Sequence, residues 1–323
     1  MRTKTSLAVL LVLSALVSCS GGGGTESESS SGTTTVRVAV SPAAGTSAPL
    51  FHAVESGTYS DLGLDVQLDT ATETNVVVPQ LMNGQLDFAM ASFESFINAA
   101  AEGLPIQMIA PANILRGGDS RFAAVIVDAG SNATDLSDTD VFAVQDAARG
   151  PQMELEVTAL NGDYDEMEML QVPLGSLAEA VASGAADAGH LFEPFLGQAL
   201  DSGDVEVLSY ITDEMTRPGA PGAILIANAD ALEDRPEVAR SFVEGTMEAF
   251  RYADENRDEI SAYTVETGLT DNPVAPENLP LYPVEPMPGS VVQDFIDFYT
   301  EYGYIPESPP LAEAVWLDSG AFS

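Results

Sequence analysis

The chain has 323 residues, a formal net charge of −39 at pH 7, 45% hydrophobic residues and one cysteine. A surface this acidic repels nucleic acid and anionic lipid, which argues against a nucleic-acid-binding role. The hydrophobic content excludes a wholly disordered chain, and a single cysteine excludes an internal disulfide.

The first nineteen residues predict export and a lipid anchor. Arg2 and Lys4 precede an apolar run that is too short to remain as a membrane-spanning helix. The run ends in Leu-Val-Ser-Cys, which resembles the lipobox of bacterial lipoproteins, whose cysteine is lipidated and becomes the mature N-terminus. We therefore expect residues 1–18 to be a lipoprotein signal peptide and Cys19 the lipidation site, on the outer side of the cell membrane. A plain signal peptide with an incidental cysteine is the alternative.

Residues 19–35 consist mainly of Gly, Ser, Thr and Glu, a composition that predicts a flexible tether. Removal of residues 1–18 takes away Arg2 and Lys4. The remaining chain has nine basic residues, all arginine, and 50 acidic residues, which gives a formal charge of −41. Like-charge repulsion on this scale destabilises a compact state unless salt screens it. We therefore hypothesise a halophilic, salt-adapted protein, which a melting temperature independent of potassium chloride would contradict.

From residue 36 onward, short apolar strands alternate with helices. The strands before the first long crossing are predicted at 36–40, 63–68, 87–90 and 106–110. The helices between them are predicted at 49–59, 75–82 and 92–101. This alternation is typical of βαβ units, so we expect an α/β fold with mainly parallel sheets flanked by helices.

The same rhythm returns after a β-branched run at 122–127, which predicts an extended crossing. Strands are predicted at 141–144, 167–172, 186–190 and 205–210, and helices at 152–160, 177–182 and 194–200. A second crossing at 222–227 precedes helices predicted at 236–254, 257–267 and 291–302. We therefore expect a discontinuous first lobe, 36–127 and 223–323, and a continuous second lobe, 128–222.

One short pattern occurs twice, one hundred residues apart. Gly84–Met90 and Gly184–His190 each follow a helical run and place Asp three residues after the glycine. A small apolar strand and a Phe-Glu pair come next, which predicts a helix end, a tight turn and a buried strand. Ligands of open α/β sheets sit beyond the carboxyl ends of such strands, so two such loops predict one cleft between paired lobes. Helix–turn–strand units also recur in unrelated α/β proteins, so the pattern alone leaves this open.

The order and spacing of several stretches resemble bacterial solute-binding proteins of ABC importers. The branch concerned captures nitrate, sulfonates such as taurine, or the aminopyrimidine precursor of thiamine. The resemblance covers roughly residues 36–265 and rests on 38–40 before a proline, 63–66, 81–87, 101–106, Glu193-Pro194-Phe195 and 236–256. It implies a two-lobed periplasmic-binding-protein-like (type II) fold with two hinge crossings that closes on a small nutrient. It further implies a monomer that delivers this nutrient to an ABC permease and its ATPase.

Five loops supply candidate ligand-binding residues, and several of these residues have a structural alternative. In the first lobe, hydroxyls and a helix start point to Thr46 and Ser47, although Ser47 also suits a helix cap. The second loop contributes Glu73 and Thr74. The third contributes Ser92, Phe93 and Glu94, with Phe93 as a stacking platform and Glu94 also favoured by the helix dipole. The second lobe contributes Arg149, an anion receptor or a surface ion pair, together with His190, Phe192 and Glu193.

The charge of the ligand stays open at this point. Glu73, Glu94 and Glu193 favour a neutral or cationic nitrogen heterocycle, such as an aminopyrimidine stacked on Phe93 or Phe192. Arg149 and the helix starts instead favour an oxyanion such as an alkanesulfonate, taurine or nitrate. We expect a nitrogen heterocycle as the ligand, with an oxyanion as the alternative.

Other functional classes are also open. No Gly-x-Ser-x-Gly elbow, Walker loop or His-Glu-x-x-His motif occurs, and the chain holds only two histidines, His52 and His190. We therefore expect no enzyme, cofactor or metal. A pyrimidine-synthase-like enzyme shares the fold in fungi but carries a cysteine-rich motif that is absent here. A sensory lipoprotein without a transporter is the other alternative.

Overall fold

The computed structural model describes residues 33–70, 74–116, 118, 121–148, 150–271 and 273–323. The predicted signal peptide, Cys19 and nearly all of the predicted tether lie outside these residues. Residues 33–323 form one compact unit that contains two five-stranded sheets. None of the helices in the described part combines the length and apolarity that a membrane span requires.

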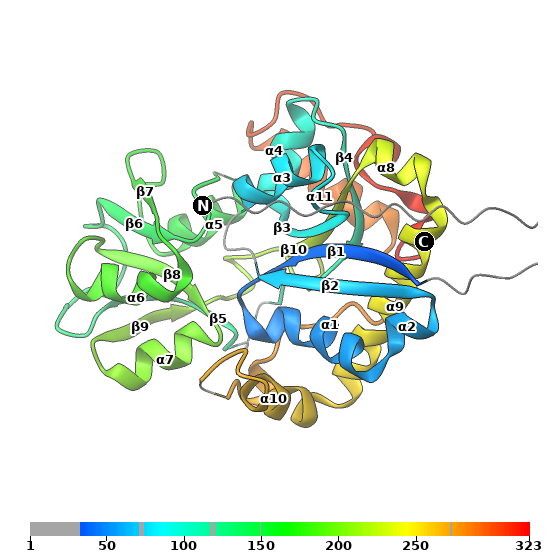
Figure 1. The fold of residues 1–323 in the computed structure, drawn as a ribbon. Helices are drawn as coiled ribbons and strands as arrows, with labels where there is room; N and C mark the ends of the chain where they lie inside the picture. Colours follow the sequence, from blue (N-terminus) through cyan, green and yellow to red (C-terminus); the bar gives the residue numbers. More distant parts are fainter. Residues whose placement is uncertain (1–32, 71–73, 117, 119–120, 149, 272) are drawn as a thin grey trace, which may run out of the picture. The chain divides into compact units, whose positions relative to one another are not determined.

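The first sheet has the strand order β2-β1-β3-β10-β4 (Figure 1). Its strands are β1 (Thr34–Val40), β2 (Leu64–Thr70), β3 (Phe88–Ser92), β4 (Ile106–Pro111) and β10 (Ala223–Asn228). Strand β1 pairs in parallel with β2 and β3, whereas β10 runs antiparallel to both β3 and β4. The strand that returns from the second crossing is thus inserted into a sheet whose other strands share one direction.

The second sheet repeats this arrangement in the order β7-β6-β8-β5-β9. Its strands are β5 (Ala123–Asp128), β6 (Val141–Val144), β7 (Glu168–Gln171), β8 (Ala188–Phe192) and β9 (Val205–Tyr210). Strand β5 is antiparallel to β8 and β9, as β10 is to β3 and β4. The expected α/β class with helix-flanked sheets is therefore confirmed, with one antiparallel crossing strand in each sheet.

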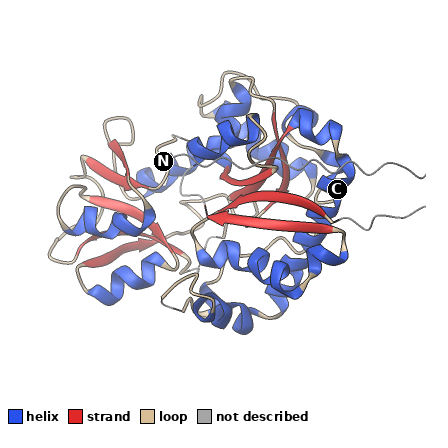
Figure 2. Cartoon of the chain, in the orientation of Figure 1, coloured by secondary structure: helices blue, strands red, loops and turns tan. Residues whose placement is uncertain are grey.

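The helices lie between and around these strands (Figure 2). Those before the second crossing are α1 (Ala44–Ser56), α2 (Thr58–Asp61), α3 (Thr74–Met82), α4 (Phe93–Ala101), α5 (Pro151–Ala159), α6 (Leu174–Ala182) and α7 (Phe195–Ser202). Those after it are α8 (Ala229–Asp234), α9 (Pro236–Glu255), α10 (Arg257–Glu266), α11 (Gly289–Glu301) and α12 (Leu311–Ala314), with 3₁₀ turns at Pro276–Asn278 and Leu317–Ser319. The sequence does not predict α8 or α12, which are only six and four residues long.

Helix α1 begins at Ala44, five residues before its predicted start at Pro49. Proline suggests a helix start because it lacks the N–H that would bond to the carbonyl four residues earlier. Here that carbonyl belongs to Gly45, and it instead accepts a hydrogen bond from the Tyr282 hydroxyl at 2.6 Å. A residue 237 positions away in the sequence thus supplies the hydrogen bond that the internal proline cannot donate to this carbonyl.

Each sheet is buried on both faces. In β5, Ala124 and Ile126 pack with α6 and α7, whereas Val125 and Val127 pack on the opposite face. This alternation follows from the two-residue period of side chains along a strand. The core of the first sheet includes Phe242 of α9 among its buried residues. The C-terminal helices therefore share a core with the first sheet.

The two copies of the repeated pattern fold alike. Gly84 and Gly184 both end a helix with positive φ, at +72° and +74°, where a side chain would be strained. The Asp87 amide donates to the Arg37 carbonyl, and the Asp187 amide donates to the Val141 carbonyl, both at 2.9 Å. Each of these two aspartate carboxylates also accepts a backbone N–H from the neighbouring strand, that of Arg37 in β1 or of Val141 in β6. The pattern therefore builds the amino ends of β3 and β8.

Candidate functional site

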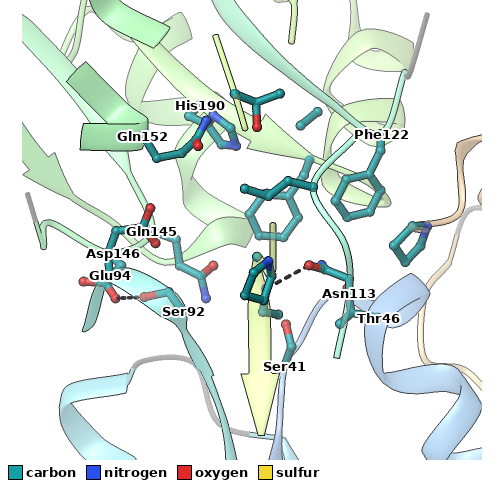
Figure 3. Close-up of a pocket in the computed structure, with 18 of the residues that line it drawn as sticks. Ser41, Thr46, Ser92, Glu94, Asn113, Phe122, Gln145, Asp146, Gln152 and His190 are labelled. Carbon is teal, nitrogen blue, oxygen red and sulfur yellow. Dashed lines mark hydrogen bonds between the residues drawn. The ribbon is translucent and has the colours of Figure 1, made fainter. Parts of the chain in front are cut away.

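A cavity of about 290 Å³ lies beyond the carboxyl ends of strands from both sheets. Figure 3 shows Glu94, Asp146 and Ser92 grouped on one side, Gln152 and His190 on another, and Phe122 opposite the acidic group. Strands β1, β3, β4, β6, β8 and β9 end at this cavity, as is usual for ligand sites of open α/β sheets.

Asp146 connects the two sheets across one wall of the cavity. Its carboxylate accepts a hydrogen bond from the Ser92 hydroxyl at 3.1 Å and another from the Ser95 hydroxyl. The other carboxylate oxygen accepts from the Ala148 backbone N–H at 3.0 Å. Ser92 also caps α4, because its hydroxyl accepts from the Ser95 backbone N–H. Asp146, two residues after β6 of the second sheet, is thus held against the first turn of α4, which follows β3 of the first sheet.

Glu94 lies in the first turn of α4 and lines the same wall. Burial raises the pKa of its carboxyl, and the neighbouring Asp146 charge adds to the rise. The Glu94 backbone N–H, the Tyr299 hydroxyl and the His190 charge act in the opposite direction. This carboxyl therefore holds its proton more readily than an ordinary glutamate, which would let it donate as well as accept a hydrogen bond.

His190 lines the cavity from β8, and its ring is tied to a buried acid on α5. The Nδ1 atom lies 2.8 Å and 2.9 Å from the two carboxylate oxygens of Glu156, a residue only 2% exposed. Burial alone lowers the pKa of His190, but the charge and hydrogen bond of Glu156, together with the Glu94 charge, raise it above its usual value.

Gln152 lies one turn before Glu156 on α5 and also lines the cavity. Its Nε2 donates to the Met215 carbonyl at 2.6 Å, which fixes the orientation of the amide. Its Oε1 is buried without a hydrogen-bond partner among the residues that the structure describes. Buried acceptors of this kind are uncommon in proteins.

Two phenylalanine rings supply an apolar part of the cavity lining. Phe122 precedes β5 and Phe192 ends β8; their ring centroids lie 5.9 Å apart with an interplanar angle of 20°. Both line the cavity. Stacked against each other, they leave no room for a third ring between them, so a planar ligand would pack on the exposed side of the pair.

Asn113 fixes the second crossing at the floor of the cavity. Its Oδ1 accepts a hydrogen bond from the Ala223 backbone N–H at 2.8 Å, and its backbone carbonyl accepts from the Gly222 N–H at 3.2 Å. A side chain on Gly222 would meet Asn113 Oδ1 at 2.5 Å, so only glycine fits here without rearrangement. The start of β10 is thereby held at the end of β4.

The structure brings five predicted site residues to the cavity: Thr46, Ser92, Glu94, His190 and Phe192. It places three others elsewhere. The Ser47 hydroxyl donates to the carbonyl of Ala43, the residue before α1. Phe93 is 1% exposed and packs against Phe96 and Phe295 in the core, so it is no stacking platform in this structure. Glu193 accepts from the Gly197 N–H at 3.0 Å, and burial raises the pKa of its carboxyl.

Glu73, Arg149 and the lipidation candidate Cys19 lie outside the described residues, and Thr74 is the first residue of α3. The sequence singles out only Arg149 in the segment before α5, whereas Gln145, Asp146 and Gln152 near it line the cavity. Arg116 is the one arginine among the described lining residues, and it is exposed. No cluster of three or more potential metal ligands occurs among the residues searched, which are the described ones.

Solved structures identify the fold as that of periplasmic binding proteins. The nitrate-binding protein NrtA from Synechocystis PCC 6803 matches with a TM-score of 0.69 at 18% identity, over 89% of this chain and 87% of that one. The alkanesulfonate-binding protein SsuA from Xanthomonas axonopodis pv. citri, bound to MOPS, matches with a TM-score of 0.70 at 14% identity, over 87% and 98%. At these identities the likeness shows the fold alone.

The family follows from the sequence match. A family model described as NMT1/THI5 like matches residues 45–260. The chain therefore belongs to the NMT1/THI5-like family. Among curated proteins, the formylaminopyrimidine-binding protein of Halalkalibacterium halodurans is 22% identical over 216 residues, or 65% of this chain. That match spans 63% of the relative's own length.

Proposed function

We propose that this protein is an extracytoplasmic solute-binding protein that captures a small nutrient in the cavity and delivers it to an ABC import permease and its ATPase. Family membership, the periplasmic-binding-protein fold and the names of the similar proteins support this role. The two sheets would form the cores of two lobes that close on the ligand. Strand β5, which the sequence assigns to the first lobe, would then belong to the second.

The proposed ligand is a neutral or cationic nitrogen heterocycle of the aminopyrimidine kind. One observation carries this choice: the cavity combines the Glu94 and Asp146 carboxyls with the aromatic rings of Phe122 and Phe192. Carboxyl oxygens suit the N–H groups of an aminopyrimidine, and an aromatic surface suits its ring. An oxyanion would need those acids to be neutralised before it could bind beside them.

The tether and anchor complete the proposal. Cys19 would carry the lipid, and residues after it would connect the anchor to the two lobes, so that a monomer works close to its permease. The sequence pattern before Cys19 supports this location. Mass spectrometry of the membrane-associated protein would test it, because an unmodified Cys19 would refute the anchor while leaving ligand binding unaffected.

A thermal-shift panel tests the proposed ligand class. The panel holds aminopyrimidines, including a formylaminopyrimidine, alongside taurine, alkanesulfonates and nitrate, all in high salt. Ligand at 100 times its dissociation constant is expected to stabilise the protein by about 2.7 kcal/mol. We expect only the aminopyrimidines to raise the melting temperature. A shift with a sulfonate or nitrate, and none with any heterocycle, would establish the oxyanion alternative instead.

Salt is expected to stabilise the folded protein. With a formal net charge of −39, the folded chain concentrates repulsion that the unfolded chain relieves. The Debye length falls from about 10 Å at 0.1 M salt to about 3 Å at 1 M, so screening reduces this repulsion. The melting temperature should therefore rise steadily with potassium chloride over this range. Calorimetry in sucrose of matched water activity serves as the control, and a flat salt profile would contradict the proposal of salt adaptation.

A further inference from the structure

We infer that Glu156 acts as a positioning residue that keeps His190 as a charged hydrogen-bond donor, with Nε2–H directed to the ligand cavity. The inference rests on three features of the pair. Glu156 is 2% exposed, both of its carboxylate oxygens lie within 2.9 Å of Nδ1, and His190 lines the cavity. Its ligand-binding consequence also rests on the proposed function.

The geometry dictates which nitrogen carries the proton that faces Glu156. An ionised carboxylate only accepts hydrogen bonds, so Nδ1 must donate to it. The opposite ring nitrogen, Nε2, has no hydrogen-bond partner among the residues described. It carries a proton only when the ring is charged, because the neutral ring has its single proton on Nδ1.

Burial makes the acid dependent on its partner. A carboxylate that is 2% exposed loses most of its hydration, and an opposite charge beside it offsets that loss. The side chain of His190 is 22% exposed, so the ring is the member of the pair that reaches the cavity. The pair thus places a cationic ring at the cavity and its carboxylate partner in the core.

The groups around His190 favour the same charge state. Glu94 on α4 contributes a second negative charge that favours the imidazolium, and Asp146 lies beside Glu94 before α5. Phe192 adds an aromatic contact, because its ring meets the His190 ring edge-on with centroids 6.1 Å apart. Among the described lining residues the other cation is Arg116, which is exposed.

A ligand therefore meets a fixed donor on one wall and the Glu94 carboxyl on another. It should present a hydrogen-bond acceptor, such as a ring nitrogen or carbonyl oxygen, to His190 Nε2. It should also present an N–H donor toward Glu94. An aminopyrimidine has both, because its ring nitrogens accept and its exocyclic amine donates.

Nuclear magnetic resonance of the histidine rings tests the charge state without any ligand. The chain has only His52 and His190, so a His52→Gln variant leaves a single ring to titrate. Long-range proton–nitrogen spectra of the ¹⁵N-labelled full chain distinguish the charged ring from each neutral tautomer. We expect His190 to titrate above the ordinary histidine value of about 6.5. In a Glu156→Gln variant, which keeps an acceptor but loses the charge, the midpoint should fall by about one pH unit or more.

Glu179→Gln is the matched control, because it removes one exposed carboxylate from α6, which packs on the sheet that contains His190. It should leave the His190 midpoint in place. A midpoint at or below the ordinary value in the parent protein would overturn the inference. An unchanged midpoint in Glu156→Gln would overturn it as well, since Glu156 would then not control the ring.

The ligand arm measures the dissociation constant of an aminopyrimidine between about pH 5.5 and 8.5, corrected for titration of the free ligand. A hydrogen bond from a charged donor is lost as the ring deprotonates, so affinity should weaken by about tenfold or more through the His190 midpoint. Glu156→Gln should move this inflection to lower pH together with the ring titration. A dissociation constant that does not change across the His190 midpoint would overturn the donor role. If no heterocycle binds at all, the proposed ligand class fails, while the ring titration still decides the state of the pair.

Discussion

Replacing Phe93 by alanine is expected to lower the free energy of unfolding by about 3–5 kcal/mol. The Phe93 ring is 1% exposed and lies 4.7 Å from Phe295 and 5.6 Å from Tyr299, measured between ring centroids. Its removal would leave a cavity beneath α4 in the core of the first sheet. Urea denaturation in high salt, followed by circular dichroism, measures the change.

The control for Phe93→Ala is Phe192→Ala, which removes a ring of equal size from a half-buried position at the cavity. We expect the control to lose clearly less stability, because its ring borders open space. If Phe93→Ala were as stable as the parent protein, the placement of Phe93 in the core would be contradicted, and its role as a stacking platform would have to be reconsidered.

The Phe192→Ala substitution is expected to weaken aminopyrimidine binding by about 10- to 100-fold. Stacking of a base on an aromatic side chain contributes about 1–3 kcal/mol by alanine substitution, and Phe192 offers such a surface beside Phe122. Isothermal titration calorimetry at fixed pH measures the dissociation constant. This prediction rests on the proposed function.

Phe195→Ala is the matched control for affinity. Phe195 lies three residues further along the chain, on α7, where it packs with the core of the second sheet and is not among the cavity-lining residues. It should bind the heterocycle within about twofold of the parent protein. Equal affinities for Phe192→Ala and the parent would show that stacking on this wall does not contribute.

The repeated pattern explains why only one of the two predicted phenylalanines, Phe192, lines the cavity. Counted from the matching glycines Gly84 and Gly184, Phe192 corresponds to Ser92, not to Phe93. Ser92 and Phe192 are the last residues of β3 and β8, and both line the cavity. Phe93 follows the end of β3 as the first residue of α4, so an offset of one residue places its side chain on the buried face of that helix. Matching the Phe-Glu pairs by residue type hides this difference.

Most of the secondary structure could be predicted because it depends on local periodicity. Strands such as β1 and β6 and helices such as α9 lie within two residues of their predicted bounds. The sheet membership of β5 could not be predicted, because a β-branched run at a crossing is compatible with either sheet. The early start of α1 depends on the distant Tyr282 hydroxyl, which no local pattern around Pro49 indicates.

The candidate site could be predicted only as far as strand ends determine it. The rule that ligands lie beyond the carboxyl ends of strands points to the segments that hold Thr46, Ser92 and His190, all of which line the cavity. Glu156 and Gln152 could not be predicted as site residues, because both lie inside a helix. Only the fold brings this helix to the cavity that His190 lines. A charged residue such as Glu156 beside Val157 gives no signal distinguishing a buried partner from a surface charge.

Asp87 and Asp187, the aspartates of the repeated pattern, have a structural role, although the pattern itself suggests a ligand site. Asp87 accepts a hydrogen bond from the Arg37 backbone N–H at 2.8 Å and pairs with the Arg235 guanidinium. Asp187 accepts from two backbone N–H groups, those of Asp140 and Val141. Both carboxylates therefore join strands at the end of the sheet opposite the cavity. The shared spacing of glycine and aspartate in the two copies therefore serves strand pairing rather than contact with the cavity.

A crystal structure of the protein with a bound aminopyrimidine tests the central claim most directly. We expect the ring on the exposed side of Phe192, with an acceptor within hydrogen-bond distance of His190 Nε2 and an amine beside the Glu94 carboxyl. A sulfonate or nitrate occupying the cavity in its place, with the heterocycle absent at saturating concentration, would contradict it.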